Sequence, residues 1–217
     1  VYTYIFLHCY SDIMPASRKR VAVIGAGASG LVAIKCCLDE DLHPVCFERS
    51  NDIGGLWNYK EEVTDGQGCV AKTTVINTSK EMMCYSDYPA PKEYPNYMHN
   101  TKLMQYFREY ADNFKLIPHI QFDVQVVKVT KAADYDDTGK WEIEFEKNGE
   151  TKTEVFDGVL VCTGHLADKN MPTFPGEEDF EGQRIHSHDY RNHKGFEDKR
   201  VVVIGIGNSS GDLAVDL

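Results

Sequence analysis

The sequence predicts an α/β fold, and two similar segments near its two ends are the basis of that prediction. At residues 20–30 and again at 200–211, an apolar run leads into a glycine-rich turn and then into the start of a helix. A buried strand, a tight turn and a helix in this order are typical of dinucleotide-binding units of the Rossmann type. We therefore expect a parallel sheet flanked by helices, with two nucleotide sites.

The first unit has the more complete motif. Its apolar run ends in a G-x-G-x-x-G pattern formed by Gly25, Gly27 and Gly30. These glycines let the backbone turn sharply and approach a pyrophosphate, and the helix that follows offers unpaired N–H groups to it. Glu48 comes 18 residues after Gly30 at the end of a second apolar run. That spacing favours a ribose contact over the alternative of a solvent-exposed acid at a strand end.

The second unit departs from the pattern at one position. After the run at 200–204, which predicts a strand, Gly205 and Gly207 fit the motif, but Ser210 occupies the third glycine position. Serine is small enough for helix and strand still to pack closely. The chain stops at Leu217, soon after this helix begins. We therefore expect the rest of this unit and its sheet to be missing, and hence the chain to be the N-terminal part of a longer protein.

A helix is predicted in the middle of the chain. Asn100 is placed to cap it, and the helix is expected to run to Phe114. Apolar residues at three- and four-residue spacing, Leu103, Phe107 and Tyr110 among them, should face the core.

An antiparallel meander is predicted after this helix. Apolar residues alternate at 122–126 and at 141–145, with turn signals at 137–139 and 148–149. Residues 159–164 have the pattern of a short buried strand ending in a glycine, and the Pro- and acid-rich stretch at 171–180 is typical of a linker.

Charge and cysteine content exclude some classes of protein. The 217 residues carry a net charge of −11, which argues against a nucleic-acid partner. The seven cysteines are odd in number and form no C-x-x-C pair, which fits reduced thiols in the cytosol. The same absence weighs against a flavin reductase that uses a redox dithiol. Cys36 and Cys37 are expected to pack on the first helix.

The first residues are too short an apolar patch to span a membrane. Met14 directly precedes a basic triplet and the first strand, which predicts a natural start at Met14; a signal peptide is the less favoured alternative. Because no run approaches eighteen apolar residues, membrane contact is expected only through a C-terminal part beyond this chain.

Four residues between the two units, Phe180, Gly182, His186 and Tyr190, fit the pattern F-x-G-x-x-x-H-x-x-x-[YF]. Together with the two glycine motifs, this pattern resembles the fingerprint of the flavin-containing monooxygenases. Residues 77–89 and 160–165 also resemble that family's flavin-side asparagine segment and Thr-Gly hinge. The resemblance extends from Met14 to Leu217.

The resemblance implies a flavoprotein whose FAD domain is interrupted by an NADPH domain. On this basis residues 1–15 form an N-terminal extension expected to be disordered, and 16–165 form the first part of the FAD domain. Residues 166–199 are a linker carrying the fingerprint, and 200–217 begin the truncated NADPH domain.

The resemblance also assigns roles to individual residues. Asn77 is implied to be the catalytic residue, since an amide can donate and accept hydrogen bonds without titrating. The implied FAD contacts are Gly25, Ala26, Gly27, Ala28, Ser29, Gly30, Glu48, Leu56, Trp57, Asn77 and Thr78. The implied NADP contacts are Ile76, Asn77, Gly205, Gly207, Ser209, Ser210, Gly211 and Asp212, with a helix-capping role left open for Asp212.

The chemistry implied by the resemblance needs little from protein acids or bases. NADPH reduces FAD, O₂ adds to give a flavin C4a-hydroperoxide, and a small-molecule amine or sulfide takes one oxygen atom. The fragment alone is expected to be inactive. The location implied is cytoplasmic, with association of the full-length protein with the endoplasmic reticulum membrane left open.

Two other functions stay open. One is a Baeyer–Villiger monooxygenase, against which Tyr190 speaks as a match to the N- and S-oxidising group. The other is an FAD-binding module without catalysis. A metal site is not expected. His186 and His188 are interpreted as alternate residues of a strand, and no further ligands accompany them. His165 is compatible with an ordinary surface histidine.

Overall fold

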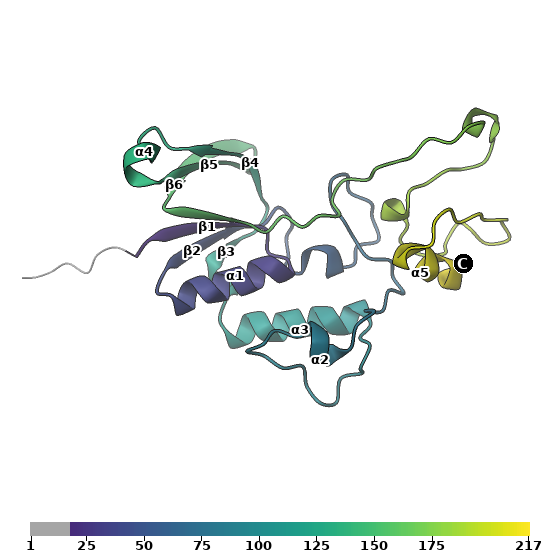
Figure 1. Cartoon of the computed structure of the whole chain (residues 1–217), viewed down its shortest axis with the longest axis horizontal. Helices are drawn as coiled ribbons and strands as arrows, with labels where there is room; N and C mark the ends of the chain where they lie inside the picture. The colour runs from purple at the N-terminus through teal and green to yellow at the C-terminus, as the bar shows by residue number, and fades with distance from the viewer. Residues whose placement is uncertain (1–17) are drawn as a thin grey trace, which may run out of the picture.

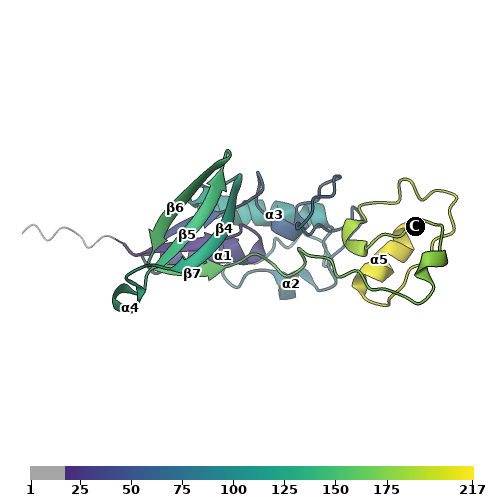
Figure 2. The same ribbon diagram turned by 90° about the horizontal axis from the view of Figure 1, so that it is seen from above.

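The structure is a computed structural model that describes residues 18–217. The expectations about residues 1–15, including the start at Met14, concern a part of the chain outside these residues. Figures 1 and 2 show a layered α/β body, with a long excursion of the chain leading from it to the C-terminus.

A four-stranded parallel sheet forms the centre of the body, as the sequence predicts. Its strands are β1 (Arg20–Ile24), β2 (His43–Phe47), β3 (Ile120–Gln121) and β7 (Gly158–Val161), in the order β3-β2-β1-β7. All three pairings in the sheet are parallel. Because β1 lies between β2 and β7, the turn after β1 meets the ends of both neighbouring strands.

Two helices stack on one face of this sheet. Helix α1 (Ala28–Asp39) packs directly on it, and α3 (Asn100–Asn113) lies beyond α1 (Figure 1). Leu31 and Ile34 of α1 are fully buried in this core, together with Leu103 of α3. The predicted apolar spacing of both helices therefore faces one common core.

The predicted meander covers the other face. Strands β4 (Val124–Lys131), β5 (Trp141–Lys147) and β6 (Glu150–Phe156) pair antiparallel in sequence order. Asn148 and Gly149 form the tight turn between β5 and β6, both with positive φ, at 53° and 78°.

Aromatic rings join the meander to the parallel sheet. The Phe47 ring of β2 lies 4.8 Å from that of Phe145 and 5.8 Å from that of Phe156, measured between centroids. These three residues are almost fully buried. A second core thus lies between the two sheets, and the parallel sheet is covered on both faces.

The remaining elements are short. They are α2 (Lys80–Met83), α4 (Tyr135–Thr138), α5 (Asn208–Asp216) and 3-10 turns at Gly55–Trp57, Ile117–His119, Glu177–Asp179 and Ser187–Asp189. None of the helices in the described part of the chain is both long and apolar enough to cross a membrane.

The prediction that Asn100 caps α3 is wrong by one residue. The N-cap is His99, whose Nδ1 accepts a hydrogen bond from the backbone N–H of Thr101 at 3.3 Å. The Asn100 amide instead donates to the carbonyls of Ala71 and Lys72, each at 3.0 Å. The Asn100 amide therefore makes long-range hydrogen bonds in place of the helix cap that the local sequence predicts.

Strand β7 forms where the sequence predicts a strand, but it is not buried. Leu160 is 39% exposed and Val161 is 71% exposed. The reason is its position at the edge of the sheet, where only β1 pairs with it. The two adjacent cysteines of α1, which are expected to pack, differ in burial: Cys37 is buried and Cys36 is exposed.

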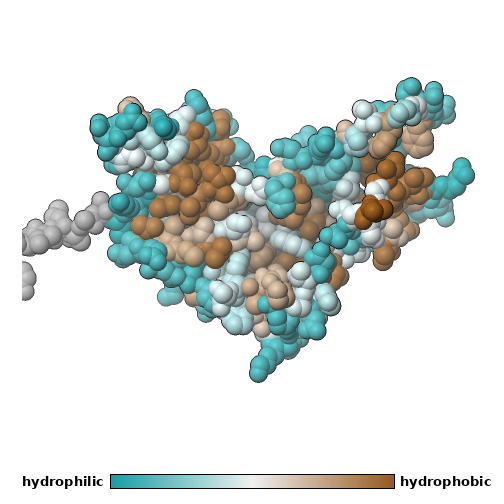
Figure 3. Space-filling model, viewed as in Figure 1, coloured by the Kyte–Doolittle hydropathy of each residue, from teal (hydrophilic) through white to brown (hydrophobic). Residues whose placement is uncertain are grey.

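The second predicted nucleotide unit forms its helix but not its strand. Residues 200–204 have no strand conformation, and Val202 and Ile204 are 83% and 72% exposed. Apolar surface gathers over this part of the molecule in Figure 3. A strand needs a hydrogen-bonding neighbour, and residues 18–217 place none beside this run.

Candidate functional site

The first glycine loop is packed too tightly for side chains. A Cβ on Gly25 would lie 2.6 Å from the Cys162 carbonyl oxygen, and Gly25 also has a φ of 100°. A Cβ on Gly30 would lie 1.9 Å from the carbonyl oxygen of Gly25. Both positions therefore require glycine, which brings β1, the start of α1 and the end of β7 together.

The N–H groups at the start of α1 have no side-chain cap. The N-cap of this helix is Gly27, and no acidic residue lies in its first turn. The backbone N–H groups of Ala28, Ser29 and Gly30 are thus free of a side-chain cap and carry the positive end of the helix dipole. This arrangement fits a pyrophosphate.

Glu48 lies directly after β2 and is only 6% exposed. Its Oε2 accepts a hydrogen bond from the Ala26 N–H at 2.7 Å, and its Oε1 accepts from the Ser50 N–H at 2.8 Å and Oγ at 2.7 Å. A carboxylate has about four acceptor positions, so one of them remains for a ribose hydroxyl. The Ala26 N–H, which the resemblance gives to the pyrophosphate, is occupied by Glu48 in this structure.

A polar hollow of about 390 Å³ opens beside this end of β2. It is lined by Arg49, Ser50, Asn51, Lys60, Thr64, Asp65, Gln67, Asp123 and Gln125. A space of this size is within the range of small-molecule sites. Its position next to Glu48 fits the nucleoside end of a dinucleotide.

The loop carrying Leu56 and Trp57 lies against the glycine loop. The Gly54 N–H donates to the Ala26 carbonyl at 3.0 Å. Gly54 has a φ of 99°, and a Cβ there would lie 2.3 Å from the Met104 sulfur. Gly55, directly before Leu56, has a φ of 52°, and a Cβ there would lie 3.2 Å from the Gly27 Cα, so the approach of the two loops also favours glycine at this position.

An ion pair fixes this loop to α3. Arg108 donates to both carboxylate oxygens of Asp52, at 3.1 and 2.7 Å. Burial alone would raise the pKa of Asp52, but Arg108 and the Ile53 N–H hold that pKa below its ordinary value.

We expect Arg108→Met to lower the free energy of unfolding by at most about 1 kcal/mol at pH 7, because Arg108 is half exposed. A depressed folded-state pKa stabilises the protein above the unfolded value of about 3.9, and that contribution is lost as the pH falls through the folded value. The difference in Tm from the wild type should therefore shrink between pH 7 and pH 3.5. Lys128→Met, on the exposed meander, is the control. A difference that stays constant with pH would contradict this account.

Asn77 is exposed and lies on a segment that connects the two predicted units. In this segment the Lys72 N–H donates to the Arg191 carbonyl at 2.8 Å, and the Thr74 hydroxyl donates to Asp212 of α5 at 3.4 Å. Ile76, by contrast, is buried, and Thr78 is exposed beside Asn77. The structure thus places Asn77 three residues from a contact with the second unit.

The fingerprint residues have different surroundings. Tyr190 is 2% exposed and donates its hydroxyl to Asp216 of α5 at 2.5 Å. Burial and this bond raise the pKa of Tyr190. Phe180 is largely exposed, and its ring lies so close to Gly182 that a Cβ there would be 2.5 Å away. The fingerprint therefore holds α5 through Tyr190.

The second glycine loop is open where the first is closed. Gly205 has a φ of 126°, and a Cβ on Gly207 or Gly211 would meet no atom within 4 Å. The Ser210 hydroxyl donates to the Gly207 carbonyl at 2.9 Å. Serine at the third motif position is thus accommodated without a clash. The structure also shows that Asp212 does not cap α5, whose N-cap is Gly207.

The histidines have a structural arrangement that differs from the strand predicted. His186 precedes a short 3-10 helix at Ser187–Asp189, and its Nδ1 accepts from the His188 N–H at 3.0 Å. Across residues 18–217, no cluster of three or more His, Cys, Asp or Glu side chains is arranged to hold a metal ion.

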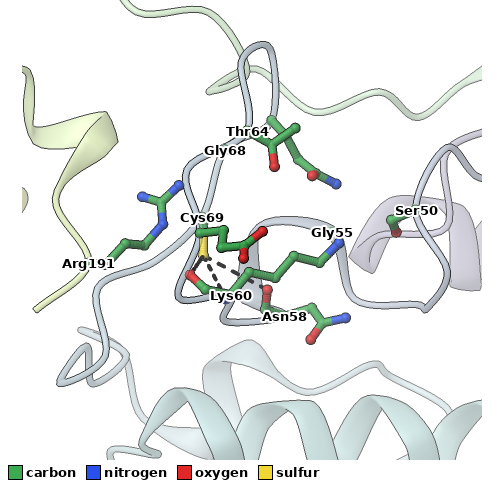
Figure 4. Close-up of a pocket in the computed structure, with 10 residues that line it drawn as sticks. Ser50, Gly55, Asn58, Lys60, Thr64, Gly68, Cys69 and Arg191 are labelled. Atoms are coloured by element: carbon green, nitrogen blue, oxygen red, sulfur yellow. Dashed lines mark hydrogen bonds between the residues drawn. The ribbon is translucent and has the colours of Figure 1, made fainter.

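A second, narrow hollow lies under the loop after Trp57. Figure 4 shows Lys60, Cys69 and Arg191 around it. The Cys69 sulfur accepts a hydrogen bond from the Lys60 N–H at 3.3 Å, so this thiol holds the loop together. Near the glycine loop, burial raises the pKa of the Cys46 and Cys162 thiols.

Several residues at the site were not predicted from the sequence. Ser50 orients Glu48, Thr74 reaches α5, and Lys80 is buried. For Ser50 a signal existed, because serine side chains often form hydrogen bonds with groups close to them in the sequence. For Thr74 and Lys80 the partners are distant in sequence, and no local pattern could identify them.

Comparison with known proteins gives one family. The model for the flavin-binding monooxygenase-like family matches residues 18–217. Flavin-containing monooxygenase 5 from Mus musculus is 56% identical over 93% of this chain. Dimethylaniline monooxygenase [N-oxide-forming] 2 from Macaca mulatta is 51% identical over 92% of the chain. The chain spans 38% of the length of each of these two relatives.

A solved structure has the same fold. The S-allyl-L-cysteine S-oxygenase from Allium sativum superimposes with a TM-score of 0.82 at 29% identity, covering 92% of this chain and 48% of the other. The prediction of an α/β flavin monooxygenase fold is thereby confirmed, and the chain spans about half the length of this neighbour.

Proposed function

The chain belongs to the flavin-binding monooxygenase-like family, and from this premise we propose that the full-length protein is an FAD- and NADPH-dependent monooxygenase. Its substrates would be small molecules with a soft nitrogen or sulfur atom. One observation carries the proposal: the segment bearing Asn77 contacts α5 through Thr74 and Asp212, and so joins the two nucleotide units.

The first unit would hold FAD. The uncapped start of α1 offers N–H groups to the pyrophosphate, and Glu48 keeps an acceptor position for the ribose. Leu56 and Trp57 would line the flavin side of the loop. Held there, FAD would supply the redox chemistry, with NADPH as the source of hydride and O₂ as the source of the transferred oxygen atom.

The second unit would hold NADPH. The start of α5 also lacks a side-chain cap, and Ser209, Ser210 and Gly211 lie in its first turns. Asp212 is half buried and bonded to Thr74, so its role would be to hold α5 beside the Asn77 segment. The nicotinamide would then approach Asn77 and Ile76.

Protein side chains would supply positioning in place of proton transfer. Asn77 has an exposed amide that can donate and accept at neutral pH without changing charge. Such a group can orient the nicotinamide and stabilise developing charge near the flavin.

The choice of nitrogen or sulfur substrates rests on relatives. One relative is named for N-oxide formation and a structural neighbour for S-oxygenation. A soft nucleophile accepts oxygen without a protein acid or base, which agrees with the amide at Asn77. A Baeyer–Villiger reaction on a ketone is the second candidate within the same chemistry.

The test is product analysis with the full-length protein, NADPH and O₂. We expect a sulfide and a tertiary amine to give the sulfoxide and the N-oxide, with NADPH consumed in proportion, and a cyclic ketone to be returned unchanged. Lactone formation from the ketone would support the second candidate. A protein that elutes without flavin and oxidises no NADPH would overturn the proposal in favour of a non-catalytic module.

The division of the chain follows from the same proposal. Residues 16–165 would be the first part of the FAD domain, 166–199 the linker and 200–217 the start of the NADPH domain. The 217-residue chain alone would not complete the reaction, because the apolar run at 200–204 is unpaired.

A further inference from the structure

Lys80 is a buried cation at the start of α2, and it is only 8% exposed. Its ammonium donates to the carbonyls of Pro91, Lys92 and Tyr94, at 3.2, 2.6 and 2.6 Å. An ammonium has three N–H donors, so these three carbonyls satisfy it completely. A single turn of the chain, 91–94, thus forms a cage around one charge.

The cage is fixed to α3. The Tyr94 side chain is 7% exposed and donates its hydroxyl to Glu109 at 2.7 Å. The Lys102 ammonium lies 4.7 Å from the centroid of the Tyr94 ring. Because Glu109 and Lys102 both belong to α3, the turn that holds Lys80 is tied to a rigid helix of the core.

The segment that bears Asn77 is held at two points. On one side the Ile76 N–H donates to the Met98 carbonyl at 2.9 Å, and Ile76 is buried. On the other side the Lys80 N–H donates to the Asn96 carbonyl at 2.7 Å. Asn77 lies between these anchors with its side chain exposed.

We propose that Lys80 is a positioning residue for the reaction: its caged ammonium fixes one end of the three-residue span 77–79 and thereby sets the direction of the Asn77 amide. This inference rests on the proposed function of Asn77. Three residues between two fixed points have few conformations, so loosening either point frees the amide.

The chemistry of the cage supports positioning over simple stability. Burying a charge costs free energy, and an apolar side chain of similar length would fill the same space without that cost. Three hydrogen bonds from one ammonium fix direction as well as distance, which an apolar side chain cannot do. Arginine keeps the charge, but its planar fork cannot reproduce three donors from one nitrogen.

The test compares Lys80→Met with Lys92→Met in the full-length protein. Lys92 belongs to the same turn and has an exposed side chain, so its loss removes the same charge without touching the cage. We expect Lys80→Met to retain FAD while product formed per NADPH falls about tenfold and hydrogen peroxide rises. Lys92→Met should behave as the wild type.

The double variant Lys80→Met with Asn77→Ala decides whether Lys80 acts through Asn77. If it does, product formed per NADPH consumed (the coupling) should be no lower in the double variant than in Asn77→Ala alone, since the two changes remove one function. Additive losses, or normal coupling in a flavin-bound Lys80→Met protein, would overturn the proposal. If Lys80→Met does not fold, Lys80→Arg takes its place, with the same non-additivity and a smaller loss expected.

Amide hydrogen exchange separates this inference from the proposed function. Exchange over residues 77–80 should rise about tenfold in the Lys80 variant and stay unchanged in Lys92→Met. Unchanged exchange would refute the link between Lys80 and the Asn77 segment. Raised exchange with normal coupling in Asn77→Ala itself would instead show that the proposed role of Asn77 is wrong.

Discussion

Gly30→Ala is expected to remove bound flavin from the full-length protein and to destabilise it by about 3 kcal/mol or more. The added Cβ would lie 1.9 Å from the Gly25 carbonyl oxygen, which is far inside van der Waals contact. Either α1 or the glycine loop must then move. Both movements disturb the uncapped helix start that would bind the pyrophosphate.

The Gly25 carbonyl has little freedom to give way. The Gly25 N–H donates to the Phe47 carbonyl at 2.8 Å, and the Cys46 thiol donates to the Gly25 carbonyl at 3.6 Å. On its other side, the Gly25 backbone lies against Cys162. The loop is therefore held by both β2 and the end of β7. Small movements of the loop cannot relieve the clash with an added methyl group.

Flavin absorbance per protein and Tm measure this effect. Gly158→Ala is the matched control, because a Cβ on Gly158 of β7 would meet only the Val21 side chain, at an ordinary 4.0 Å. That variant should keep its flavin and its Tm. Full flavin occupancy and an unchanged Tm in Gly30→Ala would show that the loop is softer than its contacts indicate.

Sequence identified the parts of the site whose partners are local. The strand, glycine turn and helix around Gly25 to Gly30 are consecutive, and Glu48 directly follows the next strand. Spacing along the sequence is therefore enough to locate them. The meander was also identified, because alternation and turn residues such as Asn148 and Gly149 are local signals.

The remaining features depend on residues far away along the chain. Local sequence predicts that Asn100 caps a helix, whereas its amide donates to the carbonyls of Ala71 and Lys72. The strand expected at 200–204 has the right composition but no neighbouring strand in the described part of the chain. Lysine is usually a surface residue, and the burial of Lys80 depends on a turn eleven to fourteen residues later in the chain. Local propensity cannot report such tertiary contacts.

Asn77→Ala is expected to bind FAD normally and to oxidise NADPH, but to form product about 100-fold more slowly, with hydrogen peroxide made in its place. The side chain is exposed, so its removal should change the stability by no more than about 0.5 kcal/mol. Loss of one preorganised hydrogen-bonding group at a reacting centre typically costs about 100-fold or more in rate. Stability and activity should therefore separate in this variant.

The measurement is product formed per NADPH consumed, together with flavin content and peroxide. Asn96→Ala is the control, because Asn96 is an exposed asparagine on the neighbouring segment whose backbone carbonyl, which survives the change, accepts from Lys80. Asn77→Asp adds a second comparison: it keeps the shape but replaces the neutral amide donor with a charged acceptor, so product formation should fall there too. Normal coupling in Asn77→Ala would exclude Asn77 from the reaction, whereas loss of NADPH oxidation with flavin retained would assign it to orienting the nicotinamide.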